Sequence, residues 1–266
     1  EFGEGVAFFS LEMTDMELTD RLIASESGIS ADKLKGKVKM NPEEWVVLEQ
    51  SIKRLVKAPL YIDETPGITL TEFTAKAKRL VREKGVKIIF VDYLQLMHSG
   101  KPQQGGFSKV QEVTEISNTL KTTAKDLKVP IIALAQLNRN LMSRAGSNGK
   151  PVLSDLKDSG SIEQDADMVI FIHRPGMVGM SEDLTEAEIL IAKNRSGKVG
   201  SIEMKYNGDL VRFEDVAPFY ESMMNAEPKP AQPVQKQNPA PAYDPTIPPP
   251  PSYNPFDEFS QNDFIQ

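Results

Sequence analysis

Three apolar segments of the sequence run into polar side chains suited to phosphate chemistry, namely Glu12, Asp92 and Gln136. A carboxylate at the end of a strand can hold magnesium directly or through water, and a second one can orient and polarise an attacking water. A neutral amide can contact a terminal phosphate and sense its loss. Each residue alone is more often a cap or an ion-pair partner, and Asp63 ends a strand in the same way. Together the three favour a nucleotide site.

A basic pair, Lys193 and Arg195, follows the apolar run 188–192. Two residues apart on a strand, the pair shares a face, so both side chains can reach one phosphate. An arginine supplied by a neighbouring subunit is a known way to stabilise transition-state charge. The alternative is a solvated basic turn, and the spacing alone favours that alternative.

The segment Ser154–Asp167 is dense in small polar and acidic residues. The amides of residues 159–161 can bind an anion such as a DNA phosphate, although the surrounding acids oppose this, and a plain helix-capping loop is the simpler interpretation. His98 and His173 lack metal-ligand spacing, so ordinary surface or core roles are expected for both.

The elements that must position these residues alternate along the chain. Continuous apolar runs predict buried strands, helix-start signals separate them, and this alternation predicts an α/β fold with a mainly parallel sheet flanked by helices. After Asp167 the runs come closer together, with Asn207-Gly208 as a hairpin turn, so antiparallel strands are expected at one sheet edge. The expected strands are 6–10, 60–63, 86–92, 130–136, 168–173, 188–192, 201–206 and 210–213, and the clearest helices are 41–57, 69–85 and 110–127.

The composition of the 266 residues, 39% hydrophobic and 26% charged, predicts one globular core and a tail. We expect a core at residues 1–219 and a disordered tail rich in Pro, Gln and Asn at 220–266. The absence of cysteine excludes disulfides and thiolate metal sites. No apolar run reaches membrane-spanning length, so a cytoplasmic protein is expected.

The net charge of −7 argues at first against nucleic-acid binding. From Glu221 onward, however, there are six acids and two lysines, so −4 of that charge lies in the tail and the net charge decides little. Acidic and aromatic residues alternate at 254–259 and 263–265, a layout suited to docking in a partner's groove, with solubilising disorder as the slightly favoured alternative. The loops Ser99–Ser108 and Arg144–Pro151 are expected to be mobile.

No segment fits the phosphate-binding pattern Gly-x-x-x-x-Gly-Lys-[Ser/Thr]. The nearest string, 196–200, lacks the hydroxyl and follows a strand on the wrong side of the predicted fold. The chain begins without an initiator Met and leads directly into a strand, so we expect it to be cut at this end.

Six motifs lie along the chain, namely Phe9-Ser10-Leu11-Glu12-Met13, 89–96, 135–139, 153–156, 159–167 and 192–197. Together they closely resemble the bacterial DnaB-type replicative DNA helicases, over about residues 6–216. The resemblance implies a RecA-like fold in a homohexameric ring that hydrolyses ATP with Mg²⁺ between subunits and moves 5′ to 3′ on single-stranded DNA. It also implies primase and a helicase loader as partners.

Roles follow from the resemblance motif by motif. Glu12 would be the general base, Asp92 the magnesium-associated acid and Gln136 the γ-phosphate sensor, whereas Lys193 and Arg195 would act on the neighbouring subunit's nucleotide. The central-channel loop that meets the DNA backbone, largely through main-chain groups, would include Lys157, Asp158 and Gly160. The family more often has Arg and Glu at the first two of these positions, and its phosphate-binding loop and amino-terminal primase-contacting domain are not in this sequence.

Two hypotheses therefore stand. In the first, the chain is the carboxy-terminal part of an ATP-driven helicase, inactive by itself because the phosphate-binding loop is missing. In the second, it is a non-hydrolysing module, truncated or degenerate, that binds DNA or joins a ring.

Overall fold

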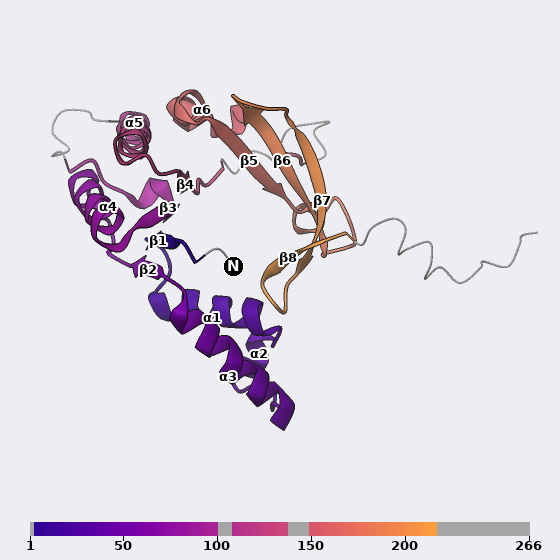
Figure 1. Ribbon diagram of the computed structural model, residues 1–266. Helices are drawn as coiled ribbons and strands as arrows, with labels where there is room; N and C mark the ends of the chain where they lie inside the picture. Colours follow the sequence, from indigo (N-terminus) through magenta and orange to yellow (C-terminus); the bar gives the residue numbers. More distant parts are fainter. Residues whose placement is uncertain (1–2, 101–107, 138–148, 217–266) are drawn as a thin grey trace, which may run out of the picture. The chain divides into compact units, whose positions relative to one another are not determined.

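Four of the expected strands pair in one parallel sheet (Figure 1). The computed structural model describes residues 3–100, 108–137 and 149–216, and within them this sheet has the order β2-β1-β3-β4. Since the strands are parallel, their carboxyl ends meet at one edge, where ligands bind in open α/β sheets. The strands are β1 (Gly5–Ser10), β2 (Leu60–Asp63), β3 (Val86–Asp92) and β4 (Ile131–Ala133).

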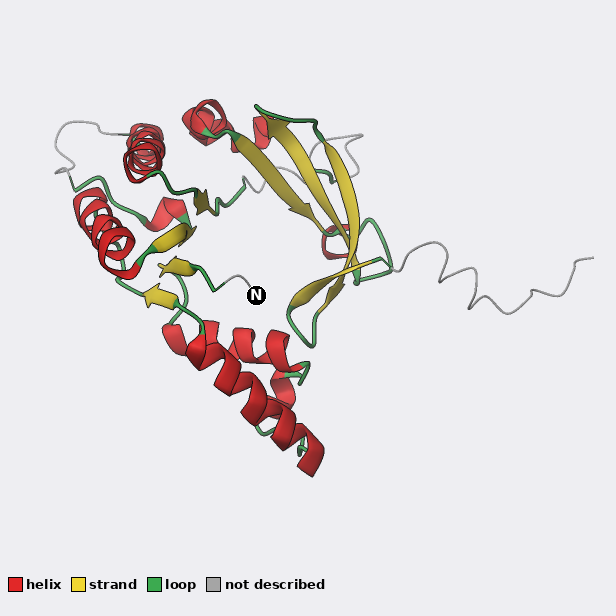
Figure 2. Cartoon of the chain, viewed as in Figure 1, coloured by secondary structure: helices red, strands yellow, loops and turns green. Residues whose placement is uncertain are grey.

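Helices alternate with these strands (Figure 2), and the four long ones begin with a capping box. In each capping box, the N-cap side chain accepts a hydrogen bond from the backbone N–H of the third helical residue. The side chain of that third residue accepts a hydrogen bond from the backbone N–H of the N-cap residue. Such a cap contributes about 1 kcal/mol to the stability of the helix. The helices are α1 (Asp15–Ser27), α2 (Ala31–Leu34), α3 (Pro42–Lys57), α4 (Leu70–Lys84), α5 (Lys109–Leu127) and α6 (Gly160–Asp165).

The connection between α4 and β3 is a single glycine. Gly85 adopts φ +66°, a left-handed conformation that favours glycine, and its N–H donates to the carbonyl oxygen of Leu80. β3 begins at the next residue, Val86. This sharp turn sets the start of the strand that ends in Asp92.

Helices α4 and α5 cover one face of the parallel sheet. Phe9 of β1 meets Phe73 of α4 edge to face, with ring centroids 4.8 Å apart, and Ile89 of β3 and Ile116 of α5 belong to the same fully buried cluster. Phe8 and Phe90 lie on the opposite face, stacked at 5.9 Å and only partly buried. The sheet is therefore better covered on one face than on the other.

The carboxy-terminal strands form an antiparallel sheet with the order β5-β6-β7-β8. In the described ranges no strand pairing joins it to the parallel sheet, so these strands do not extend the parallel sheet's edge as expected. The hairpin between the last two strands has a four-residue loop, with the positive φ at Val211 and not at Gly208. The strands are β5 (Met168–His173), β6 (Glu186–Asn194), β7 (Gly200–Asn207) and β8 (Arg212–Asp215).

Strand β4 is shorter than the expected range 130–136. The N–H of Leu134 still donates to the carbonyl oxygen of Val91 at 2.9 Å, but its own carbonyl oxygen accepts from the N–H of Leu94 at 3.0 Å. Leu94 begins a 3-10 turn after β3. The chain therefore leaves the ladder after Ala133, and Gln136 lies three residues beyond the strand.

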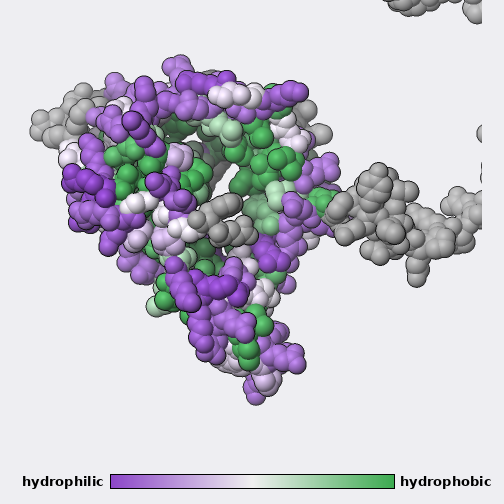
Figure 3. All heavy atoms as spheres, in the orientation of Figure 1, coloured by the Kyte–Doolittle hydropathy of each residue, from purple (hydrophilic) through white to green (hydrophobic). Residues whose placement is uncertain are grey.

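Apolar side chains remain exposed on the antiparallel sheet. Every second residue of β5 is buried, while Met168, Ile170 and Ile172 on its other face are 48%, 51% and 58% exposed; Figure 3 shows hydrophobic residues gathered at the surface over these strands. On the parallel sheet Ile132 of β4 is also exposed. No helix in the described part of the chain is long and apolar enough to cross a membrane.

Two expected loops and the expected tail lie wholly or largely outside the described residues. The described residues all fall within one compact unit, 1–217. The boundary at 219 and the properties of the tail stay predictions.

Candidate functional site

The carboxyl ends of β1 and β3 lie side by side. Ser10 is the register partner of Asp92, and the N–H of Leu11 donates to the carbonyl oxygen of Asp92 at 2.8 Å. Glu12 is the next residue along the chain. The structure thus places Glu12 and Asp92 together at one edge of the parallel sheet.

Asp92 is partly buried and lies close to a second negative charge. Burial raises the pKa of its carboxyl above the ordinary value, the Glu12 carboxylate raises it further, and Arg21 of α1 lowers it. Among the described residues, neither carboxylate takes part in a hydrogen bond or an ion pair. Two adjacent carboxylates without a bonded partner favour the approach of a cation or a proton.

Asp63, at the end of β2, has the opposite environment. Lys76 of α4 lies 2.7 Å from its Oδ2, and the N–H of Thr65 donates to its Oδ1 at 3.1 Å. Burial raises the pKa of Asp63, but the hydrogen bonds from Lys76 and Thr65 outweigh burial and hold the pKa below its ordinary value. Asp63 is a structural carboxylate with its bonding capacity already engaged.

Gln136 is fixed through its backbone. The side chain of Gln95 donates from Nε2 to the carbonyl oxygen of Gln136 at 3.0 Å and accepts the N–H of Gln136 on Oε1 at 3.2 Å. Lys109 of α5 in turn donates to the carbonyl oxygen of Gln95. This reciprocal pair ties Gln136 to the turn after β3 and leaves the Gln136 side chain without a bonded partner among the described residues.

Lys193 and Arg195 both reach the segment around α6. Lys193 lies in β6 and donates from Nζ to the carbonyl oxygen of Glu163. Arg195 follows the strand and donates to the carbonyl oxygen of Gln164 and, at 3.0 Å, to Oδ1 of Asp167. The two side chains therefore act on one side of the strand, and they hold the carbonyl end of α6.

Lys157, Asp158 and Gly160 lie at the other end of α6. The first two belong to the 3-10 segment Leu153–Ser159, and Gly160 is the first residue of α6. α6 therefore begins directly after this segment and also contains Glu163 and Gln164, whose carbonyl oxygens accept hydrogen bonds from Lys193 and Arg195.

A sequence model for the DnaB-like helicase C-terminal domain matches residues 1–215. The chain belongs to this family.

Two curated relatives show how much of a DnaB-like protein the chain represents. It is 42% identical over 213 residues to "Replicative DNA helicase DnaB" of Leifsonia xyli subsp. xyli, which covers 80% of this chain and 45% of the relative. It is 41% identical over 212 residues to the protein of the same name from Geobacillus stearothermophilus, covering 79% and 45%. The chain spans less than half the length of these relatives.

Two solved structures share the fold. One is described as an "ATPase Domain" and matches with a TM-score of 0.73 and 32% identity, over 80% of this chain and 75% of that one. "The Structure Of A DnaB-Like Replicative Helicase And Its Interactions With Primase" matches with the same TM-score and identity, over 80% and 51%. The expected RecA-like α/β fold is confirmed.

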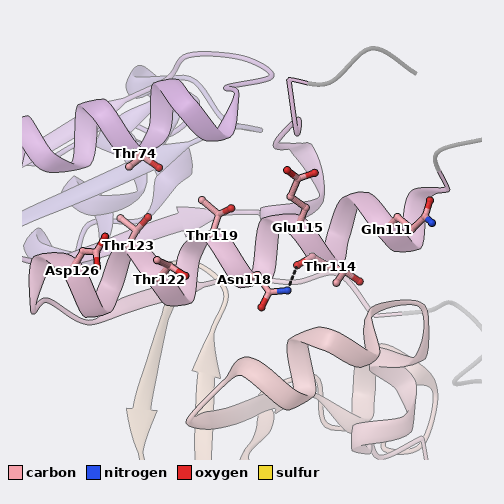
Figure 4. A pocket seen from close by; sticks show the side chains of 9 residues that line it. All are labelled: Thr74, Gln111, Thr114, Glu115, Asn118, Thr119, Thr122, Thr123 and Asp126. Carbon is pink, nitrogen blue, oxygen red and sulfur yellow. Dashed lines mark hydrogen bonds between the residues drawn. The ribbon is translucent and has the colours of Figure 1, made fainter. Parts of the chain in front are cut away.

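A polar groove of about 620 Å³ lies along α5, with α4 contributing Thr74 (Figure 4). Its lining includes Thr114, Asn118 and Thr122, and Asn118 donates back to the carbonyl oxygen of Thr114 within the helix. None of the predicted site residues lines this groove. The groove is therefore separate from the carboxylates Glu12 and Asp92.

Three residues with contacts to the candidate site were missed from the sequence. They are Arg21, whose charge acts on Asp92, Gln95, which holds Gln136, and Asp167, which binds Arg195. Gln95 and Asp167 lie within the motifs that carry the DnaB resemblance, so the motifs were the available signal. Arg21 carries no such signal, because it lies inside an amphipathic helix among other charges.

The histidines make ordinary contacts. Nδ1 of His98 lies 3.5 Å from Oε1 of Glu112 in α5. His173 is buried at the end of β5, and burial lowers its pKa, against the opposing effect of Glu188. Neither belongs to a group of three or more potential metal ligands in the described ranges.

Proposed function

We propose that the protein containing this chain is a replicative DNA helicase. It couples ATP hydrolysis at the subunit interfaces of a homohexameric ring to 5′ to 3′ movement on single-stranded DNA and to duplex unwinding. The observation that carries the proposal is the pair of carboxylates, Glu12 and Asp92, at the carboxyl ends of the strands of a RecA-like sheet in a DnaB-like domain. In the part of the chain that the structure describes, neither has a hydrogen-bond or ion-pair partner. Asp92 is partly buried beside the Glu12 carboxylate, and a carboxylate perturbed both by burial and by a nearby charge is typical of a functional site.

The residues at this edge fit Mg²⁺ with a nucleoside triphosphate. Magnesium keeps several waters and binds through one or two carboxylates plus substrate phosphates, so the absence of a three-ligand cluster in the described residues is compatible with it. When bound, the ion neutralises charge on the phosphates. Asp92 would hold the ion, Glu12 would accept the proton of the attacking water, and the side-chain amide of Gln136, which has no bonded partner among the described residues, would contact the terminal phosphate.

The basic pair acts between subunits. Arg195 is 49% exposed although it is ion-paired, so its guanidinium remains accessible from outside the chain. In the ring, Arg195 and Lys193 stabilise negative charge on the nucleotide of the neighbouring subunit.

Other partners follow from the family. The backbone of Lys157, Asp158 and Gly160 contacts the DNA phosphates, and the primase named with one solved relative suggests a primase contact in the intact protein. A helicase loader and a tail-docking partner complete the proposed interactions.

The missing phosphate-binding pattern supports the alternative of a non-hydrolysing DNA-binding or ring-assembly module. The coding sequence upstream of Glu1 separates the two proposals. An in-frame Gly-Lys-Thr loop there removes the alternative. For the 266-residue chain alone we expect no appreciable ATP hydrolysis, and DNA-stimulated turnover by the purified chain would contradict this.

The interface model is tested by mixing two inactive forms of the intact protein, Glu12→Gln and Arg195→Ala. Each alone should lose DNA-stimulated ATP hydrolysis, by about 10²-fold or more for the base and about 10³-fold or more for the arginine. In a random equal mixture, roughly a quarter of the interfaces combine an intact Glu12 with an intact Arg195 from the next subunit. Turnover should therefore reappear on mixing. Mixed rings, verified by mass, that stay inactive would rule out action between subunits.

A further inference from the structure

Asp167 bonds to Arg195 through both its backbone and its side chain. The N–H of Arg195 donates to the carbonyl oxygen of Asp167 at 2.9 Å, and Nη1 of Arg195 donates to Oδ1 of Asp167 at 3.0 Å. Nη2 donates to the carbonyl oxygen of Gln164. Within the described part of the chain, two of the five guanidinium N–H groups are thus engaged and three remain free.

The same carboxylate is shared with a second cation. Nζ of Lys121 in α5 lies 2.5 Å from Oδ2 of Asp167, and the bond from Lys121, followed by the charge and bond of Arg195, holds the pKa of Asp167 below its ordinary value. The two cations bind different oxygens of the carboxylate, so loss of the Lys121 bond to Oδ2 leaves the Arg195 bond to Oδ1 in place.

We propose that Asp167 is a positioning residue that holds the Arg195 guanidinium in the orientation in which it meets the neighbouring subunit's nucleotide. A free arginine side chain loses rotamer entropy when it is fixed in one orientation. Asp167 and the Gln164 carbonyl group fix much of the side chain in advance, so less is lost in the transition state. This inference rests on the proposed role of Arg195 between subunits.

The experiment uses the mixture of Glu12→Gln and Arg195→Ala intact proteins as its baseline. Asp167→Asn is added either to the Glu12→Gln subunit, which supplies Arg195, or to the Arg195→Ala subunit, which does not. Placed beside Arg195, the substitution should lower the kcat of the restored ATP turnover by about threefold to tenfold, with KM for ATP within about twofold. Placed in the subunit without Arg195, it should leave turnover unchanged.

Lys121→Gln is the matched control, because it breaks the other ion pair of the same carboxylate. In the Glu12→Gln subunit it should change turnover by less than about twofold. The proposal is overturned if Asp167→Asn acts equally from both subunits, if Lys121→Gln lowers turnover as much, or if Asp167→Asn raises turnover, which would make Asp167 a restraint on Arg195. A baseline mixture that is itself inactive refutes instead the action of Arg195 between subunits.

Discussion

Two aspartates end β2 and β3, the strands on either side of β1 in the parallel sheet, and they have opposite surroundings. Asp63 at the end of β2 is bonded to Lys76 and Thr65, and its pKa lies below the ordinary value. Asp92 at the end of β3 is partly desolvated beside Glu12, and its pKa lies above the ordinary value. In the sequence both are simply acids after an apolar run.

The difference shows which strand end is available for a ligand. A carboxylate whose hydrogen bonds are satisfied within the chain stabilises the fold, and a ligand would have to compete with those bonds. An unpaired, desolvated carboxylate is held at a cost to stability, which a bound cation reverses. Asp63 therefore has a structural role, and the unsatisfied carboxylate of Asp92 supports the role proposed for it at the nucleotide.

The largest effect should come from Asp92→Asn in the intact protein. Loss of the charge that orients the metal should lower DNA-stimulated ATP turnover by about 10²-fold or more. The thermal midpoint should not fall, since the substitution removes a repulsion with Glu12. Steady-state ATPase assays and thermal unfolding check both parts, with Asp63→Asn as the control. A variant that loses stability and keeps its turnover would reverse the assignment of the two aspartates.

An intermediate effect is expected from the support of Gln136, which lies beyond the end of β4. Gln95→Leu removes both bonds that fix the backbone of Gln136, and a small misplacement of a catalytic group can cost one to two orders of magnitude. We expect kcat to fall about tenfold, with KM for ATP changed by less than about threefold. Gln95→Glu keeps the acceptor for the Gln136 N–H but not the donor, so its kcat should be intermediate. If both variants matched the wild type, the backbone of Gln136 would not need this support.

Local signals predicted much of this fold. The helix expected at 41–57 matches α3, because its Asn41 cap, first-turn proline and acids are all local. The predicted end of β4 was wrong, because the strand's end depends on a distant residue. The N–H of Leu94 donates to the carbonyl oxygen of Leu134, which therefore does not pair with a neighbouring strand. Local patterns also do not record the side-chain bonds of Gln95 and Asp167, whose partners are 41 and 28 residues away. The sequence showed which residues suit chemistry, and tertiary contacts separated Asp92 from Asp63.

The smallest effect is expected from Asp63→Asn. The pH dependence of its free energy of unfolding tests the comparison between Asp63 and Asp92. Asp63 has a folded pKa below its ordinary value of 3.8, so its stabilisation is complete above that pH and is lost as the pH falls through the folded pKa. Asp92 has a folded pKa above 3.8, so its destabilisation is complete above that raised pKa and fades as the pH falls toward 3.8.

At pH 7, Asp63→Asn should therefore lower the free energy of unfolding by about 1 kcal/mol, while ATP turnover stays within about twofold of the wild type. On lowering the pH toward about 4, the deficit of Asp63→Asn should persist while any gain of Asp92→Asn shrinks. Denaturant titrations of both variants across this pH range measure how the free energy of unfolding of each variant changes with pH. Equal slopes would mean that the two carboxylates experience the same environment, which would remove the physical basis for distinguishing their roles.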